Sequence, residues 1–311
     1  MGTLILKLGA AGDVVRTTTL LHLLDEDVSW LTADENAALL EGLSRPVEVL
    51  PWSRREAWKG RKFDLVINLE DTSSAAAFLA GPEHGQLFGA RLDEDGGLVY
   101  SDDSAEWFDM SLISRFGKEE ADRRKLANRR TYQEMLFAGL GARFRGEPYH
   151  LPAGKAAGLM GDVAIAPRAG SVWPIKNWAY FDGLVSELRA EGLTVNVLPQ
   201  RDTLVDHLAD VRGHACLVSG DSLPMHLALG SGVPPVTIFT CTSPWEIHGY
   251  GIQHKVVSPL LDRYFYRRDF DARATTCVSV GEVFGQVAGL LALKDAGTVP
   301  DRSPGAVDRV I

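Results

Sequence analysis

Short, apolar, β-rich runs alternate with helix-length segments along almost the whole chain, and this alternation restricts the possible folds more than any other feature. Strands that alternate with helices in this way form parallel sheets covered by helices. We therefore predict an α/β protein. The runs lie at residues 3–8, 28–31, 47–50 and 65–69 in the first half, and at 163–166, 194–198, 215–218, 236–239 and 255–257 in the second.

The chain of 311 residues exceeds the usual size of a single domain, which favours two. We expect Rossmann-like domains at 1–152 and 153–293, whose parallel sheets face a central cleft at the carboxyl ends of their strands. Residues 294–311 lack hydrophobic periodicity, and we expect a flexible tail there. The two halves meet at a linker that contains Gly146, Pro148, Pro152 and Gly154.

Two segments have the apolar spacing of helices, residues 125–140 and residues 181–188. A last helix is predicted from Ser279, because Ser279 and Glu282 have the spacing of a capping box.

The charge and the cysteines narrow the class of protein. A net charge of −9 and a pI near 5.4 argue against nucleic-acid binding, which usually leaves a basic surface. The three cysteines are far apart and show no metal-ligand spacing, which fits a reduced cytoplasm. The N-terminus reads as a strand, not a signal peptide, and no apolar stretch long enough to span a bilayer is evident. Weak contact with a membrane surface stays open.

The first strand runs into a glycine turn, which we define as residues 9–13. Gly9 and Gly12 allow a ligand to approach the backbone closely. The turn is not GxGxxG, so a nicotinamide dinucleotide is disfavoured. Asp13 at the helix start is open to two interpretations: an N-cap or favourable charge at the positive end of the helix dipole, and a catalytic carboxylate. The two roles are compatible.

A second turn, the GDS turn at residues 219–226, follows an apolar strand of the second half and opens a helix rich in small residues. Its exposed backbone N–H groups, with Ser222 and His226 nearby, suit a diphosphate without any bound metal. The alternative is an ordinary βα turn in which Asp221 caps the helix.

Between these turns lies the lysine loop, which we define as residues 169–178. It holds Lys176 between Trp173 and Trp178. A lysine there is suited to present a compact cation to phosphate. Alternatively, the tryptophans belong to the core and Lys176 is a solvated surface group.

Two charged segments have simpler explanations. Asp93, Glu94 and Asp95 stand before two glycines and predict a solvated turn, not a metal-binding Asp-x-Asp motif. The basic run at residues 123–130 predicts an exposed helical face, with contact to an anionic acceptor or membrane surface as the alternative.

Taken together, these motifs resemble the ADP-heptose-type heptosyltransferases of glycosyltransferase family 9. The resemblance covers nearly the whole chain through KLGAAGDVVRTT, VWPIKNW, SGDSLPMHLALGSGVP and FTCTSP, in that order. It implies a GT-B fold, Asp13 as catalytic base and Lys176 as phosphate ligand. It also implies that the donor diphosphate is held by Gly220, Asp221, Ser222, Leu223, Pro224, Met225 and His226, with Thr240 and Thr242 in the neighbouring loop.

The chain also departs from this family. Many relatives carry several cysteines near the C-terminus, whereas residues 258–269 have none, so a metal or redox role there is disfavoured. Residues 68–74 on the acceptor side differ from the enzymes of the lipopolysaccharide core, so the acceptor need not be lipopolysaccharide.

The leading hypothesis is an inverting, metal-independent glycosyltransferase that moves a sugar, in the resemblance a heptose, from a nucleotide-diphosphate donor to an acceptor hydroxyl. No cofactor is expected beyond this co-substrate, which the resemblance suggests is ADP-heptose, and the acceptor would be a glycan, a glycolipid or a small molecule. Two alternatives stay open: a nucleotide-sugar epimerase of the same architecture, and a non-catalytic sugar-nucleotide-binding protein.

Overall fold

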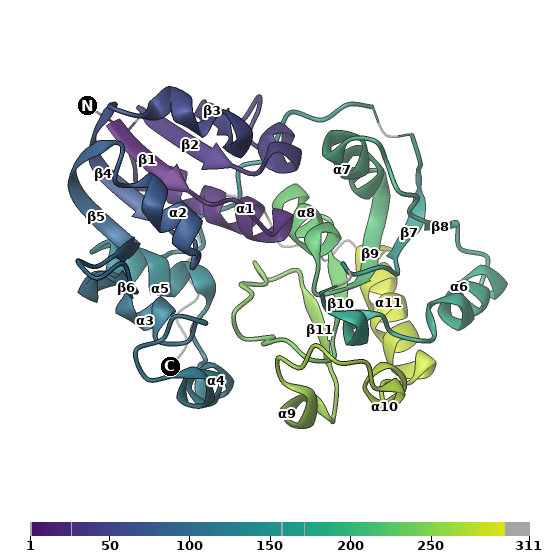
Figure 1. Ribbon diagram of the computed structural model, residues 1–311. Helices are drawn as coiled ribbons and strands as arrows, with labels where there is room; N and C mark the ends of the chain where they lie inside the picture. Colours follow the sequence, from purple (N-terminus) through teal and green to yellow (C-terminus); the bar gives the residue numbers. More distant parts are fainter. Residues whose placement is uncertain (1, 26, 157, 171, 296–311) are drawn as a thin grey trace.

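The computed structural model contains two β-sheets, one in each half of the chain, with helices packed around them (Figure 1). It describes residues 2–25, 27–156, 158–170 and 172–295. Every predicted strand is confirmed to within three residues at either end. The α/β class is therefore as the sequence predicts.

The first sheet has the strand order β3-β2-β1-β4-β5-β6. All neighbours are parallel except β5 and β6, which pair antiparallel. The order reverses between β1 and β4, and ligands of open α/β sheets bind at such a switch point. The strands are β1 Gly2–Leu6, β2 Val28–Thr32, β3 Glu48–Pro51, β4 Lys62–Asn68, β5 Glu83–Leu92 and β6 Leu98–Tyr100.

The second sheet is parallel throughout, in the order β11-β10-β9-β7-β8. Its switch point lies between β7 and β9, so the loops that leave these two strands meet at one edge. The strands are β7 Gly161–Ala166, β8 Val195–Val197, β9 His214–Gly220, β10 Pro235–Phe239 and β11 His254–Val257.

Helices cover both faces of each sheet. In β1, Ile5 packs on one side with α1 and α5, while Leu4 and Leu6 pack on the other with α2. This explains the continuous apolar runs, because a strand buried on both faces has no polar side to alternate with. The helices of the first half are α1 Ala11–Thr17, α2 Ser73–Phe78, α3 Ala105–Phe108, α4 Lys118–Ala127 and α5 Tyr132–Gly139.

The second half has the same layering, with α7 and α8 on one face and α6 and α11 on the other. Its helices are α6 Phe181–Ala190, α7 Leu204–Arg212, α8 Leu223–Ser231, α9 Leu261–Tyr264, α10 Ala272–Thr276 and α11 Val280–Asp295. Ser279 accepts the backbone N–H of Glu282 at the start of α11, as the capping spacing predicts.

The two halves share part of their core. Val15 of α1 and Leu39 belong to the same buried cluster as Met225 and Leu227 of α8. The predicted linker forms no helix or strand in its described residues, and Tyr149 within it is buried in that cluster too. Helices α1 and α8 thus meet directly between the sheets (Figure 1).

Some predicted bounds are wrong. The helix expected at 125–140 is two helices, because Thr131 and Glu134 form a capping box that starts α5 anew. Strands β5 and β6 were not predicted. Helix α11 continues to Asp295, past the expected domain end at 293, and the rest of the predicted tail, 296–311, lies outside the described residues.

One helical stretch of the described chain, Ala272–Ala292, is long and apolar enough to cross a membrane. This differs from the sequence analysis, which predicts no stretch of that length. However, residues 277–279 separate its two helices, α10 and α11, and Val283 and Val287 of α11 are fully buried against the second sheet. Core helices of this kind meet the same length and composition criteria, so we infer no membrane span from it.

Candidate functional site

Both switch points carry a lysine paired with a carboxylate. At the first, Lys7 Nζ lies 2.8 Å from Glu70 Oε1, and that oxygen also accepts the backbone N–H of Leu8. At the second, Lys176 Nζ lies 3.0 Å from Asp221 Oδ2. The chain therefore places paired charges where the topology predicts ligand binding.

The glycine turn leads from β1 into α1, and Asp13 lies in the first turn of that helix. The N-cap is Ala10, and no side chain caps the helix. Asp13 is therefore not the N-cap, but it lies in the first turn, where a negative charge is favourable to the helix dipole. Its Oδ1 instead lies 2.8 Å from Arg16 Nη2, one turn further along.

The charges around Asp13 keep its carboxyl group ionised. Burial alone would raise the pKa of Asp13, but the nearby cations Arg16 and Lys7 outweigh this and hold the pKa below its ordinary value. The side chain keeps 33% of its surface exposed. Asp13 is thus an ionised, accessible carboxylate, as a general base must be.

Gly12 brings the glycine turn against the GDS turn of the other half. A Cβ atom at Gly12 would lie 2.7 Å from Cδ2 of His226. Only glycine permits this approach, because real Cβ contacts are longer. The other glycine of the turn, Gly9, has no such constraint: its nearest atom would be 3.8 Å away, in Asn36.

His226 lies in α8 between the two halves and is buried. Burial, with the nearby Arg16 cation, lowers the pKa of His226 to about 4. Its Nδ1 lies 3.4 Å from the hydroxyl of Tyr149. The imidazole is therefore neutral near pH 7, and it would meet a diphosphate as a hydrogen-bonding group and not as a cation.

The lysine loop and the GDS turn meet at Lys176. Its Nζ donates to the backbone carbonyl of Asp221 at 2.8 Å and to the Asp221 carboxylate, which also accepts from Thr242 Oγ1 at 2.7 Å. The side chain of Lys176 is 11% exposed, so it is not a solvated surface group. An ammonium group has three N–H donors, which leaves one for a ligand.

Asp221 does not cap α8, contrary to the alternative interpretation of this turn. The N-cap is Ser222, and it makes no side-chain cap hydrogen bond. Burial alone would raise the pKa of Asp221, but Lys176, with the hydrogen bond from Thr242, lowers it to about 2. Asp221 is therefore an anion that holds Lys176 in place.

The first residues of α8 complete this edge. Pro224 has no N–H, so the outward donors come from Ser222 and Leu223. Gly220 passes close to the lysine loop, because a Cβ there would lie 3.0 Å from the Lys176 carbonyl oxygen. Met225 is fully buried, and Thr240 Oγ1 donates to the carbonyl of Ile175, which anchors the lysine loop to the end of β10.

A pocket of about 370 Å³ adjoins this edge. It lies at the carboxyl ends of β7 and β8 and reaches the start of α8 at Leu223 and Pro224. Its walls mix apolar groups with Arg168, Arg201 and His207. The volume and the mixed lining are those of a small-molecule site.

The tryptophans of the lysine loop differ in role. Trp178 is buried in the core of the second half, and its indole N–H donates to the carbonyl of Val278. Trp173 is only partly buried and packs edge-on against Tyr266, with the Lys176 ammonium 5.5 Å from its ring centroid. The core interpretation thus fits Trp178.

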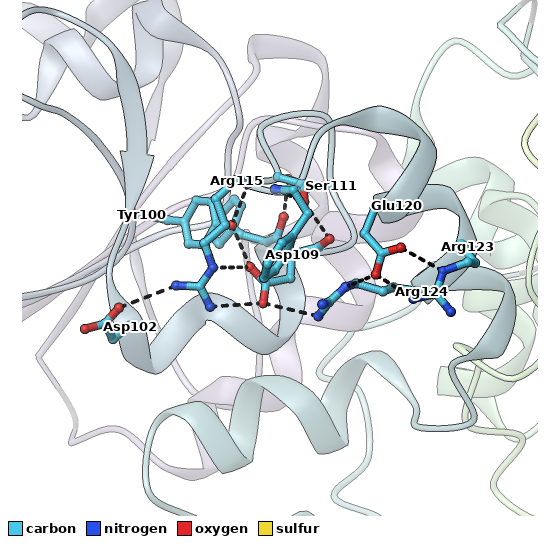
Figure 2. Close-up of polar contacts among 11 residues, drawn as sticks. Tyr100, Asp102, Asp109, Ser111, Arg115, Glu120, Arg123 and Arg124 are labelled. Carbon is cyan, nitrogen blue, oxygen red and sulfur yellow. Dashed lines mark hydrogen bonds and ion pairs between the residues drawn. The ribbon is translucent and has the colours of Figure 1, made fainter.

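The basic run is largely neutralised by acidic neighbours. Figure 2 shows Glu120 between Arg123 and Arg124, and Arg124 also reaches Asp109. Arg130 pairs with Glu106. The remaining two cations reach the second half, Lys125 over the ring of Tyr266 and Arg129 over that of Trp245.

The predicted solvated turn at residues 93–97 is confirmed, because Asp93 accepts the backbone N–H groups of Asp95 and Gly97. Within the described residues, no group of three or more His, Cys, Asp or Glu side chains could hold a metal ion.

Sequence reasoning missed several polar residues at this site. Tyr132 and Tyr149 reach it through contacts between distant segments, for which no local pattern exists. Arg16 lies one helical turn after Asp13, so its pairing with Asp13 could have been predicted from that spacing. Lys7 and Glu70 could have been found, because a charged residue within an apolar strand, or directly after one, is unusual. Glu70 moreover follows the strand on the other side of the first switch point.

No protein-family model matches the sequence, and a search of curated proteins found no match either. Solved structures do share the fold. E. coli heptosyltransferase WaaC with ADP superposes with a TM-score of 0.61 at 15% identity, covering 93% of this chain and 100% of that one. A glycosyl transferase family 9 protein from Veillonella parvula gives 0.59 at 16% identity, covering 93% and 97%. E. coli ADP-heptose LPS heptosyltransferase II gives 0.56 at 14% identity, covering 95% and 100%.

These identities establish the fold and nothing beyond it. The chain has the GT-B architecture of these glycosyltransferases over nearly its full length. The resemblance read from the sequence motifs is therefore confirmed at the level of the fold.

Proposed function

We propose that the protein is an inverting glycosyltransferase that transfers a sugar from a nucleotide-diphosphate donor to an acceptor hydroxyl. The carrying observation is the meeting of two turns from different halves: Gly12 lies against His226, and Asp13 and the Lys176–Asp221 pair are both close enough to His226 for their charges to act on it. One turn offers an ionised carboxylate, and the other offers an ammonium and a helix start to an anion.

In this mechanism Asp13 accepts the proton of the acceptor hydroxyl as that oxygen attacks the anomeric carbon of the donor. The bond from the anomeric carbon to the diphosphate breaks on the opposite face, so the configuration inverts. The charge that develops on the diphosphate is stabilised by the third N–H of Lys176 and by the backbone donors of Ser222 and Leu223, which are in place before the reaction begins.

The pocket beside α8 suits the nucleoside of the donor, because it opens at the same edge as the Lys176–Asp221 pair. Solved structures of the same fold include WaaC with ADP and with ADP-2-deoxy-2-fluoro heptose. We therefore propose an adenine nucleotide as the first donor to test and a heptose as its sugar. The acceptor would be a glycan, a glycolipid or a small molecule, and the reaction would take place in the cytoplasm or at a membrane surface, without a bound metal.

The test is incubation with a panel of nucleotide sugars, each with and without candidate acceptors, followed by product analysis. A transferase forms a new glycoside only when both substrates are present. Product from the donor alone would point to an epimerase. Nucleotide binding without any product, across the panel, would point to a binding protein and overturn the proposal.

A further inference from the structure

Arg16 is a buried cation directly behind Asp13. Its side chain is 8% exposed, although arginine is rarely so buried unless it is paired. The guanidinium Nη2 lies 2.8 Å from Asp13 Oδ1. Its Nε has no hydrogen-bond partner among the described residues.

Groups outside α1 fix the guanidinium. It lies over the ring of Tyr132, with 3.9 Å from Cζ to the ring centroid. The Tyr132 hydroxyl is 2.7 Å from Thr17 Oγ1, and its backbone N–H donates to the carbonyl of Glu246 in the second half at 3.0 Å. The ring of Trp107 packs edge-on against Tyr132. The stacking on this anchored ring keeps the Arg16 guanidinium in place. Its ion pair with Asp13 in turn fixes the position of the Asp13 carboxylate.

We propose that Arg16 is the positioning residue of the reaction: it holds Asp13 ionised and occupies Oδ1, so that the acceptor hydroxyl meets Oδ2. The catalytic part of this statement rests on the proposed function. The electrostatic part, that Arg16 keeps Asp13 ionised, does not depend on it.

The charges that face Asp13 come from four segments. Arg16 from α1 and Lys7 directly after β1 favour the ionised carboxylate, Asp221 after β9 opposes it, and His226 from α8 is neutral at pH 7. Lys7 is already paired with Glu70. Burial and Asp221 raise the pKa of Asp13, and without Arg16 they would be countered mainly by Lys7, which is shared with Glu70. The pKa of Asp13 should therefore rise when Arg16 is removed.

The test uses Arg16→Gln, which removes the charge, and Arg16→Lys, which keeps it. The Asp13 carboxyl is titrated by carbon NMR on protein with labelled aspartate and is assigned by the signal missing from Asp13→Asn. We expect the Arg16→Gln titration to move to higher pH and the Arg16→Lys titration to stay near the wild type. In activity assays, kcat/KM of Arg16→Gln should fall further below the wild-type value at about pH 5 than at about pH 8. Arg16→Lys should show no such dependence on pH.

Arg61→Gln is the matched control, because Arg61 also pairs with a carboxylate of the first half, Glu48 at 2.8 Å, but on the surface. It should leave both readouts unchanged. Nucleotide affinity should stay within about twofold in all variants, since the proposed donor site lies in the second half.

An Asp13 titration that is the same in wild type and Arg16→Gln would overturn the inference. If the wild-type protein transfers no sugar, the proposed function fails, and the NMR titration still decides whether Arg16 controls Asp13. Should Arg16→Gln not fold, Arg16→Met gives the same test, because its apolar side chain can pack against Tyr132 and Trp107.

Discussion

The two switch points are built alike and differ in what surrounds them. Each joins a lysine that is nearly buried to a carboxylate, Lys7 with Glu70 in the first sheet and Lys176 with Asp221 in the second. In the first, Glu70 also accepts the backbone N–H of Leu8, which ties the pair to its own strand end. In the second, the pair lies at the start of α8 and beside the pocket.

This comparison shows that a buried ion pair alone does not define a binding site. The carboxylate of the Lys7–Glu70 pair also accepts the backbone N–H of Leu8, so we interpret this pair as structural. Lys176 lies at the start of α8, which no side chain caps, and close to the pocket that reaches Leu223 and Pro224, so we interpret it as part of an anion site. The carboxylate that the first half offers to a substrate is Asp13, not Glu70. The predictions below test this division of roles, from the largest expected effect to the smallest.

Asp13→Asn should retain nucleotide binding and lose turnover by about 10²- to 10⁴-fold, the usual contribution of a general base. The amide keeps the shape of the side chain but cannot accept the proton. Calorimetric titration of the nucleotide diphosphate and single-turnover assays measure the two effects separately.

The control for this variant is Glu70→Gln at the first switch point, which should keep turnover within a few-fold if Glu70 is structural. Near-wild-type turnover of Asp13→Asn at saturating substrate would remove Asp13 from the mechanism. A large loss in Glu70→Gln with an unchanged melting temperature would show that the two carboxylates have been assigned the wrong way round.

Lys176→Ala should lower nucleotide affinity about tenfold or more, because a charge-assisted contact contributes roughly 1.5 to 3 kcal/mol. Turnover should fall too, since charge on the leaving group grows during transfer. Lys7→Ala is the matched variant. Both remove one partner of a buried pair and should destabilise the protein by about 3–5 kcal/mol, but only Lys176→Ala should affect nucleotide affinity.

Salt and pH sharpen this comparison. Added salt should weaken nucleotide binding more in the wild type than in Lys176→Ala. The pKa of Asp221 is lowered from 3.8 to about 2. The Lys176–Asp221 pair therefore stabilises the fold at pH values above 3.8, and this stabilisation is lost as the pH falls towards about 2. The stability gap between wild type and Lys176→Ala should therefore close in acid. Equal nucleotide affinities of Lys176→Ala and Lys7→Ala would contradict the assignment.

Gly12→Ala should lower both stability and turnover, because the new methyl group would lie 2.7 Å from Cδ2 of His226 and push the two turns apart. Overpacking of this kind costs about 1–3 kcal/mol. Gly285→Ala is the control: it adds the same methyl group in α11, where nothing lies within 4 Å, and should stabilise the helix by up to about 1 kcal/mol. Thermal unfolding measures both. A neutral Gly12→Ala would mean that the contact between the halves is not tight in solution.

Parallel topology explains how much of this site the sequence could predict. Loops that follow the strands of a parallel sheet emerge at one edge, so the order of motifs could predict that the lysine loop and the GDS turn share an edge. That β7 and β9 are neighbours, and that Lys176 pairs with Asp221, required the structure. The capping interpretations failed because they depend on which residue begins the helix. Helix α1 begins two residues before Asp13, with Ala10 as its N-cap, and α8 begins after Ser222, so neither carboxylate stands at the N-cap.

The contacts between the halves could not be predicted. The backbone N–H of Tyr132 donates to the carbonyl of Glu246, and Tyr149 lies against His226. Each contact joins residues far apart in the sequence, and no local pattern marks them. Local patterns therefore located the turns, whereas the electrostatics of Asp13 required the packed structure.

The smallest expected effect is that of a chelator, which should leave turnover unchanged. In the proposed mechanism the diphosphate charge is met by the Lys176 ammonium and the N–H groups at the start of α8, groups that the second switch point already holds in place. The acidic Asp93 that sequence alone could offer to a metal is engaged in its own turn. Assays in EDTA, with magnesium or manganese added back, measure this directly. Loss of activity in EDTA that either ion restores would mean that a metal ion, and not Lys176, stabilises the charge on the diphosphate. In that case Lys176→Ala should lose much less turnover than Asp13→Asn.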